Sequence, residues 1–168
     1  MNYILETERL ILREFTLDDT PFIIELVNSP GWLQFIGDRN IKTEEQAREY
    51  LRSGPLQSYE KNGFGLSLVA LKADQSPIGM CGIIRRDSLE NPDLGFAFLP
   101  AFEGKGLAYE MANATLAYAK NVLKLPVIFA ITMPENKRSI KLLEKIGFKY
   151  TRTFISPTDN VQLNLFSY

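Results

Sequence analysis

Three short strand-like runs in the middle of the chain precede a long helical pattern and a further strand-like run. The three runs cover residues 65–71, 78–85 and 93–99. Links as short as theirs join antiparallel strands, whereas a strand, a helix and a strand in succession form a right-handed parallel crossover. The helix begins after Gly104-Lys-Gly106, and the strand that follows it covers residues 127–132. We therefore predict an α+β fold with a mixed, mostly antiparallel central sheet and one parallel β-α-β crossover.

Capping signals place two helices before these strands and one after them. Thr16-Leu-Asp-Asp19 and Thr43-Glu-Glu-Gln46 have the cap, and the side chain three residues later, that open a helix. Asn136 is the expected cap of a short last helix, and Gly147 follows the end of that helix. The remaining strands are expected at residues 3–13, 148–154 and 161–166. The predicted order is β-α-α-β-β-β-α-β-α-β-β, and without an internal repeat or linker we expect a single domain, residues 1–168.

Composition excludes several classes of site. The 168 residues include no histidine and one cysteine, which rules out Ser-His-Asp triads, Cys-His proteases, the common zinc sites and intrachain disulfides. We therefore expect no metal. A net charge of −1 argues against broad attraction to nucleic acid, and no apolar run is long enough for a membrane span. The charged N-terminal segment is unlike a signal peptide, so the expected location is cytoplasmic.

Gly104 and Gly106 lie where a strand ends and a long helix begins. The first N–H groups of a helix have no partner within it, and glycine lets an anion approach them closely. A phosphate site and a plain tight turn are both consistent with these residues taken alone. Lys105 is not followed by Ser or Thr, as a P-loop requires, and Tyr109 stands where the dinucleotide fingerprint has its third glycine.

Two groups of segments indicate a protein family more specifically together than either group does alone. They are Gly95–Pro100 with Glu103–Ala108, and Pro134–Asn136 with Ser139-Ile140 and Glu144–Phe148. Their combination resembles the GNAT superfamily of acetyl-CoA-dependent N-acetyltransferases, and within it the RimJ/RimL-type branch of ribosomal-protein N-terminal acetyltransferases. The opening Thr7-Glu-Arg-Leu-Ile-Leu-Arg13 fits the same branch, and the resemblance spans essentially the whole chain.

The resemblance implies that acetyl-CoA binds where the strand before the glycines splays from its parallel neighbour. Backbone groups of Phe98 and Leu99 would then contact the pantetheine arm, and Asn136 would also contact the cofactor. The family's diphosphate motif falls on Glu103, Gly104, Lys105, Gly106, Leu107 and Ala108. Its first position is Gln or Arg in the family but Glu here, so we expect the backbone amides rather than that side chain to hold the diphosphate.

The same resemblance implies direct attack of a neutral amine on the thioester. Many relatives place a tyrosine in the last helix as a donor to the leaving thiolate, but Leu143 stands at that position. Ser139 is the replacement that we predict. Asp93 is a candidate general base that acts through water, and a solvated charge at the end of a strand is the other interpretation of it. Cys81 lies between apolar neighbours, which predicts a buried, inert thiol.

The predicted function is therefore acetyl-CoA-dependent N-acetyl transfer to a primary amine, either a protein N-terminus or a small molecule. Leu143 and Glu103 favour one alternative, an acyl-CoA-binding module with little turnover; the paired glycines support another, a nucleotide-binding oxidoreductase. The residues do not name the acceptor. Residues 31–37, which include Trp32 and Phe35, are expected either to line its pocket or to anchor this segment to the core. Dimers are common among relatives, so a homodimer is one expected assembly.

Overall fold

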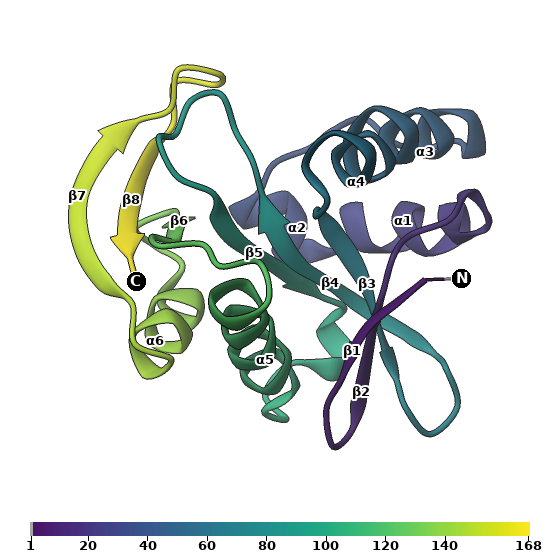
Figure 1. Cartoon of the computed structure of the whole chain (residues 1–168). Coiled ribbons are helices and arrows are strands. Elements are labelled where there is room, and N and C mark those ends of the chain that lie inside the picture. The colour runs from purple at the N-terminus through teal and green to yellow at the C-terminus, as the bar shows by residue number, and fades with distance from the viewer. Residues whose placement is uncertain (1) are drawn as a thin grey trace.

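The computed structural model describes residues 2–168, which form an eight-stranded sheet in the order β1-β2-β3-β4-β5-β6-β8-β7. The strands are β1 Tyr3–Glu6, β2 Leu10–Arg13, β3 Leu66–Leu71, β4 Pro77–Ile84, β5 Asp93–Phe98, β6 Phe129–Thr132, β7 Lys149–Ile155 and β8 Gln162–Ser167. Every neighbouring pair is antiparallel except β5 and β6, which are parallel. The predicted α+β fold with one parallel crossover is confirmed (Figure 1).

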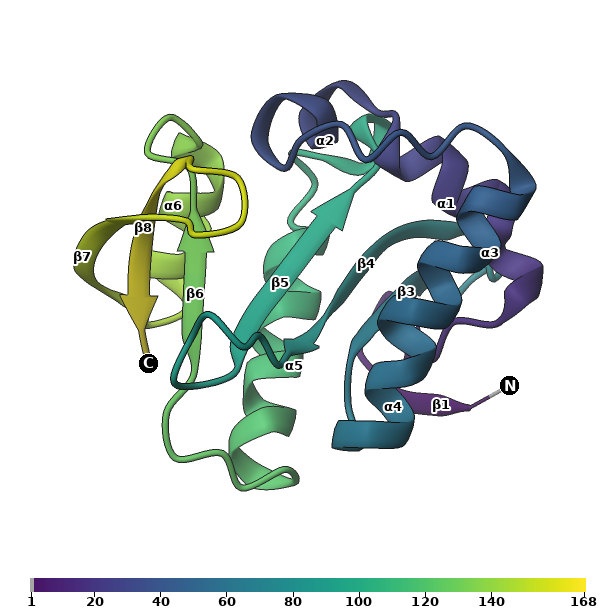
Figure 2. The same cartoon turned by 90° about the horizontal axis from the view of Figure 1, so that it is seen from above.

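Six α-helices accompany the sheet in the described part of the chain. They are α1 Thr20–Val27, α2 Pro30–Phe35, α3 Glu44–Leu51, α4 Gln57–Asn62, α5 Leu107–Asn121 and α6 Lys137–Lys145. The crossover helix α5 lies against one face of the sheet, whereas α1 to α4 gather on the opposite face (Figures 1 and 2). The expected caps are present, because the side chains of Thr16 and Thr43 each accept a hydrogen bond from a first-turn N–H.

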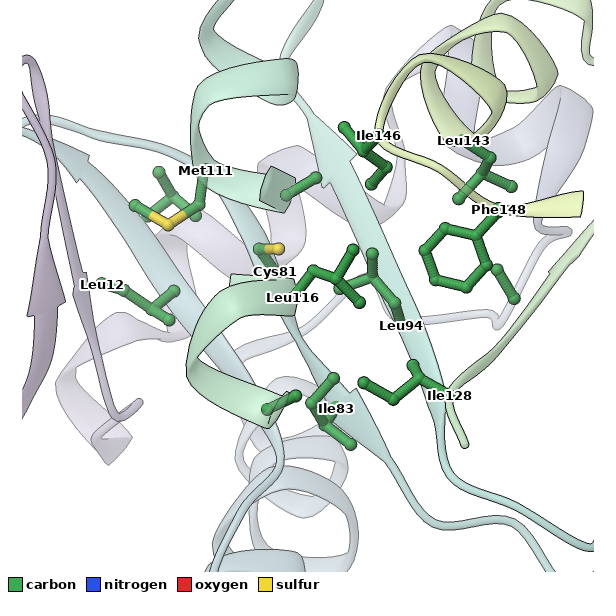
Figure 3. Packing of buried hydrophobic residues seen from close by; sticks show 14 of the residues in the cluster. Leu12, Cys81, Ile83, Leu94, Met111, Leu116, Ile128, Leu143, Ile146 and Phe148 are labelled. Carbon is green, nitrogen blue, oxygen red and sulfur yellow. The ribbon is translucent and has the colours of Figure 1, made fainter. Parts of the chain in front are cut away.

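Each face of the sheet carries a hydrophobic core. On the α5 face, Met111 belongs to one cluster with Leu94 of β5 and Leu143 of α6 (Figure 3). On the other face, Ile23 of α1 belongs to a second cluster with Leu68 of β3. The central strands are therefore buried on both sides, as in a layered α+β domain.

The first predicted strand is divided into two. Residues 3–13 form an antiparallel hairpin of β1 and β2. The Thr7 N–H donates to the Leu10 carbonyl (2.9 Å), and the Leu10 N–H donates to Thr7 Oγ1 (3.1 Å). The turn, Thr7-Glu-Arg9, contains no Gly, Pro or Asn, so its composition does not mark it as a turn.

The helical region before β3 also differs from the prediction. The first helix stops at Val27, as expected, but Pro30 then opens the short helix α2, because proline needs no N–H partner in a first turn. The helical segment that begins after the Thr43 cap continues beyond Leu51 to Asn62. A π-helical turn, Arg52–Leu56, joins α3 to α4, and Gly63, with a left-handed φ of +77°, ends α4.

Candidate active site

Strands β5 and β6 pair at one position and then separate. Asp93 lies opposite Phe129, and the Phe129 N–H donates to the Pro92 carbonyl (2.8 Å). Within residues 2–168 no further register pair joins these two strands, and Figure 2 shows them diverging toward their C-terminal ends. The strand before the glycines therefore splays from its parallel neighbour, as the family resemblance implied.

Hydrogen bonds to β4 decide which backbone groups of β5 face this gap. The Leu99 N–H donates to the Ile78 carbonyl (2.9 Å), so Leu99 and every second residue before it bond toward β4. The backbone groups of Phe96 and Phe98 therefore face β6. Because β6 has moved away at this level, Phe96 and Phe98 form an open strand edge.

Leu99 is not part of that open edge. Its N–H bonds to Ile78, and its carbonyl accepts a hydrogen bond from the Phe102 N–H (3.0 Å). The N–H and the carbonyl of Leu99, which were expected to contact the pantetheine arm, are therefore both hydrogen-bonded within the protein. Phe96, which sequence reasoning missed, lies at the open edge together with Phe98. The alternation depends on the register with β4, which sequence alone does not show.

Gly104 and Gly106 both have left-handed backbone conformations, with φ of +72° and +76°. Gly106 is the N-cap of α5 and supplies no side chain to the first turn of that helix. The N–H groups of Leu107 and Ala108 consequently have no acceptor within the helix. Residues 103–106 are exposed, so these amides and the positive end of the helix dipole are suited to an anion.

The β1–β2 hairpin is tied to this loop through Arg9 and Glu110. The Glu110 carboxylate accepts hydrogen bonds from Thr7 Oγ1 (2.6 Å), the Arg9 N–H (2.9 Å) and Arg9 Nε (2.7 Å). Burial raises the pKa of Glu110, but these hydrogen bonds outweigh it and hold the pKa below its ordinary value. Arg9 Nη1 also donates to the Lys105 carbonyl (3.0 Å). Sequence reasoning gave Arg9 no role here, because its partners lie about a hundred residues away.

The Glu103 carboxylate points away from the loop amides. It forms an ion pair with Arg138 of α6, and its Oε1 lies 3.6 Å from where a Cβ on Gly31 would be. The Lys105 ammonium lies 5.7 Å from the centroid of the Phe102 ring. The acidic residue at the first motif position is therefore paired with a cation rather than bonded to the amides of the loop.

The start of α6 lies beside the same open end of the gap. Asn136 caps the helix, as expected, and its Oδ1 accepts a hydrogen bond from the Ser139 N–H (3.3 Å). Ser139 is half-buried in the first turn. Leu143, one turn further on, is 1% exposed and packs among Ile146 and Phe148 (Figure 3). The position where relatives have a tyrosine therefore belongs to the core.

Asp93 lies at the opposite, paired end of β5, about 17 Å from Phe98 at ~3.4 Å per residue. It is 1% exposed, so the interpretation as a solvated strand-end charge is wrong. Its Oδ1 accepts a hydrogen bond from Arg86 Nε (2.9 Å), whereas its Oδ2 has no hydrogen-bond partner within the described residues. Burial raises the pKa of Asp93, and the nearby Arg86 opposes that rise only in part.

Cys81 and Trp32 are both buried. Cys81 is fully buried, and burial raises its pKa to about 12, so the expectation of an inert thiol is confirmed. Trp32 of α2 is buried in one hydrophobic cluster with residues of α1 and α3, which favours an anchoring role over an exposed acceptor pocket. Phe35 is half-buried at the end of α2.

No group of three or more metal-binding side chains occurs in residues 2–168. Nor is any helix in this part of the chain both long and apolar enough to cross a membrane.

The chain is similar to known acetyltransferases in both sequence and fold. The sequence model described as "Acetyltransferase (GNAT) domain" matches residues 9–149. The uncharacterized N-acetyltransferase YnaD of Bacillus subtilis is 28% identical over 145 residues, which covers 86% of this chain and 82% of YnaD. The protein YkkB of Bacillus subtilis is 32% identical over 155 residues, covering 89% of this chain and 87% of YkkB.

The fold is also similar to that of RimL, a ribosomal L7/L12 alpha-N-protein acetyltransferase solved in complex with coenzyme A. The TM-score is 0.85 at 14% sequence identity, and the match covers 99% of this chain and 97% of the RimL chain. At that identity the likeness concerns the fold alone. Taken with the sequence match over residues 9–149, it shows that this chain belongs to the acetyltransferase (GNAT) domain family.

Proposed function

We propose that this protein transfers the acetyl group of acetyl-CoA to a primary amine. The observation that carries the proposal is the open edge of Phe96 and Phe98, which leads to the uncapped turn at Gly106. A Cβ at Gly104 would meet no atom within 4 Å, so the loop surface is free for a ligand. The residues that would hold the cofactor are Phe96, Phe98, Gly104, Lys105, Gly106, Leu107, Ala108 and Asn136.

Acetyl-CoA supplies a thioester, and a neutral amine would attack its carbonyl, forming a C–N bond as the C–S bond breaks. Ser139 would donate a hydrogen bond to the departing sulfur from the first turn of α6. Leu143 has no N–H or O–H group in its side chain to donate a hydrogen bond, and it is buried. Because α5 covers one face of the sheet, the amine would approach across the opposite face, which carries α1 to α4 (Figure 2).

Asp93 would accept the proton that the attacking amine loses, through intervening water. Two observations support this role: the unpartnered, buried Oδ2 and a pKa that burial raises. A carboxylate with a raised pKa is a stronger base. The distance between Asp93 and the open edge requires water to carry the proton.

The acceptor class that we propose is a protein N-terminus, with a small-molecule amine as the alternative. The RimJ/RimL-type opening over residues 7–13 and the serine at Ser139 support the first class. Cytoplasmic location remains a prediction from the charged N-terminal segment, and homodimeric assembly remains one from the family resemblance. Light scattering of the purified protein measures the assembly.

The first experiment is a thermal-shift titration with acetyl-CoA, followed by a thiol-release screen over N-terminal peptides and small amines. Ligand at a hundred times its Kd stabilises the native state by about 2.7 kcal/mol, so the melting temperature should rise. NADP serves as the control and should give no shift. No shift with acetyl-CoA would contradict the proposal. Binding without thiol release would favour the alternative function, an acyl-CoA-binding module with little turnover, which Glu103 and Leu143 support.

Ser139→Ala tests the donor to the leaving group. The variant keeps the N–H that bonds to Asn136, so the helix cap survives. We expect kcat to fall about tenfold, the effect of losing one hydrogen bond to a charged group, while the KM for acetyl-CoA stays unchanged. Ser139→Thr retains a hydroxyl and should recover part of the rate. A wild-type kcat in Ser139→Ala would return Ser139 to a structural role.

A further inference from the structure

One ion pair joins the two sides of the gap between β5 and β6. Glu103 follows β5 by a short 3-10 turn, and Arg138 lies in the first turn of α6, which follows β6. Among the ion pairs within residues 2–168, no other connects these two sides. The Arg138 side chain is 67% exposed and that of Glu103 is 37% exposed, so both can change partner without disturbing the core.

Glu103 is poorly matched to the ligand that we propose for this loop. Its backbone directly precedes Gly104, and the N-terminal end of α5 favours negative charge. A diphosphate bound there would add charge of the same sign as Glu103 close to its carboxylate. Arginine binds carboxylate and phosphate with the same planar set of donors, so Arg138 is able to serve either group.

Two other cations at the loop, Arg9 and Lys105, have contacts of their own. Arg9 bonds to Glu110 and to the Lys105 carbonyl, which leaves its guanidinium committed to holding the loop. The Lys105 ammonium lies over the Phe102 ring. Arg138 differs from both, because its partner within the described residues is the carboxylate that an incoming diphosphate would repel.

We propose that Arg138 is a cofactor-binding residue that exchanges partners. Without ligand it pairs with Glu103 across the gap; when the diphosphate of CoA occupies the Gly104–Ala108 loop, Arg138 releases Glu103 and bonds to a diphosphate oxygen. The ion pair therefore competes with the ligand. This inference rests on the proposed function, because it takes CoA as the ligand of the loop.

The test measures the Kd for CoA by calorimetry in the wild type, Arg138→Met, Glu103→Gln and the double variant. Arg138→Met should raise Kd about tenfold, because it removes a charge-assisted hydrogen bond to phosphate. Glu103→Gln should act in the opposite direction and lower Kd about two- to fivefold, because the competing exposed pair is lost. When Arg138 is already methionine, adding Glu103→Gln should lower the Kd for CoA by a smaller factor, because no ion pair remains to compete with the ligand.

Two controls make the result specific. Arg48→Met removes the same single charge from an exposed ion pair on α3, with Glu44, and should leave the Kd for CoA unchanged. Dephospho-CoA lacks the 3′-phosphate but keeps the diphosphate, so Arg138→Met should weaken its binding by the same factor as that of CoA. Thermal melts of each variant check that it is folded.

Each contrary outcome has its own meaning. Wild-type protein that does not bind CoA overturns the proposed function itself. Wild-type binding together with an unchanged Kd in Arg138→Met overturns the exchange alone. An equal loss of affinity in Arg138→Met and Glu103→Gln would show a pair that merely supports the loop. A loss seen with CoA but not with dephospho-CoA would move the contact to the 3′-phosphate and overturn the assignment to the diphosphate.

Discussion

Asp93 is a carboxylate buried at the paired end of β5, with one oxygen on Arg86 and the other without a donor within the described residues. A buried polar atom without a partner costs free energy that folding must offset elsewhere. Replacing the aspartate with an apolar residue would remove that cost. The buried, unpartnered oxygen supports the proposed role of a proton acceptor that acts through water.

Asp93→Asn tests this environment through pH. Because the pKa of the folded protein lies above the ordinary value of 3.8, the folded state binds the proton more tightly than the unfolded state. The stabilisation from the protonated form is therefore complete below pH 3.8 and is lost as pH rises through the folded pKa. The free energy of unfolding of the wild type, relative to Asp93→Asn, should fall over that window. Parallel urea titrations at several pH values measure the difference; a difference independent of pH would mean that the pKa is not raised.

Gly106 has a closely matched control elsewhere in the chain. Its φ and ψ are 76° and 4°, and those of Gly63, at the end of α4, are 77° and 6°. Valine at either position should cost about 1–2 kcal/mol of stability, the strain of a left-handed L-residue. Only Gly106→Val should also abolish the rise in melting temperature with acetyl-CoA, because its side chain would stand in the Gly104–Ala108 loop proposed to hold the diphosphate. A normal shift in that variant would locate the cofactor elsewhere.

At the scale of elements, the β1–β2 hairpin acts as a brace for the first turn of α5. Arg9 turns the Lys105 carbonyl toward itself, so the N–H of the same peptide group, that of Gly106, faces the opposite way. Glu110 fixes Arg9 in that position with two bonds, and Thr7 adds a third bond to the same carboxylate. The loop is thereby held in shape before a ligand arrives.

Arg9→Met should therefore raise the Kd for CoA about fivefold, which corresponds to ~1 kcal/mol of lost preorganisation. Lys72→Met is the matched control, because Lys72 also bonds to the hairpin, at Glu6 (3.0 Å) and the Thr7 carbonyl (3.3 Å), but not to the loop. Both changes should reduce stability by no more than about 1 kcal/mol, as expected for exposed pairs. Equal Kd values for Arg9→Met and the wild type would restrict the hairpin to a role in folding.

For the whole molecule, the continuous sheet links the two hydrophobic cores. Neighbouring strands are hydrogen-bonded from β1 through to β7, so neither core has a separate scaffold. We therefore predict that the chain unfolds as one domain in a single cooperative transition.

Met111→Ala tests that coupling. Met111 is 0% exposed between α5 and the sheet (Figure 3), and its truncation should cost about 2–5 kcal/mol. Val122→Ala, at the end of the same helix but 62% exposed, should change stability by less than about 0.5 kcal/mol. Urea unfolding followed by far-UV circular dichroism and by Trp32 fluorescence should give coincident curves, although Trp32 lies in the other core. Separate transitions would show two independent units.

Local signals in the sequence determined the order of elements from β3 onward, the α+β fold with its parallel crossover, and the caps at Thr16, Thr43 and Asn136. They did so because hydrophobic period and capping act between residues only a few positions apart. The glycines before α5 are local signals of the same kind. Glycine adopts a left-handed backbone at little steric cost because it has no Cβ. Gly104 and Gly106 therefore marked the turn without reference to any distant partner.

Tertiary structure decided the rest of the candidate site. The register of β5 on β4 brings Phe96 rather than Leu99 to the open edge. The burial of Asp93 and the pairs Arg9–Glu110 and Glu103–Arg138 depend on contacts between residues far apart in the chain. A charged side chain carries no local mark of its partner, because Coulomb attraction acts through space and only the folded chain sets which charges lie close together.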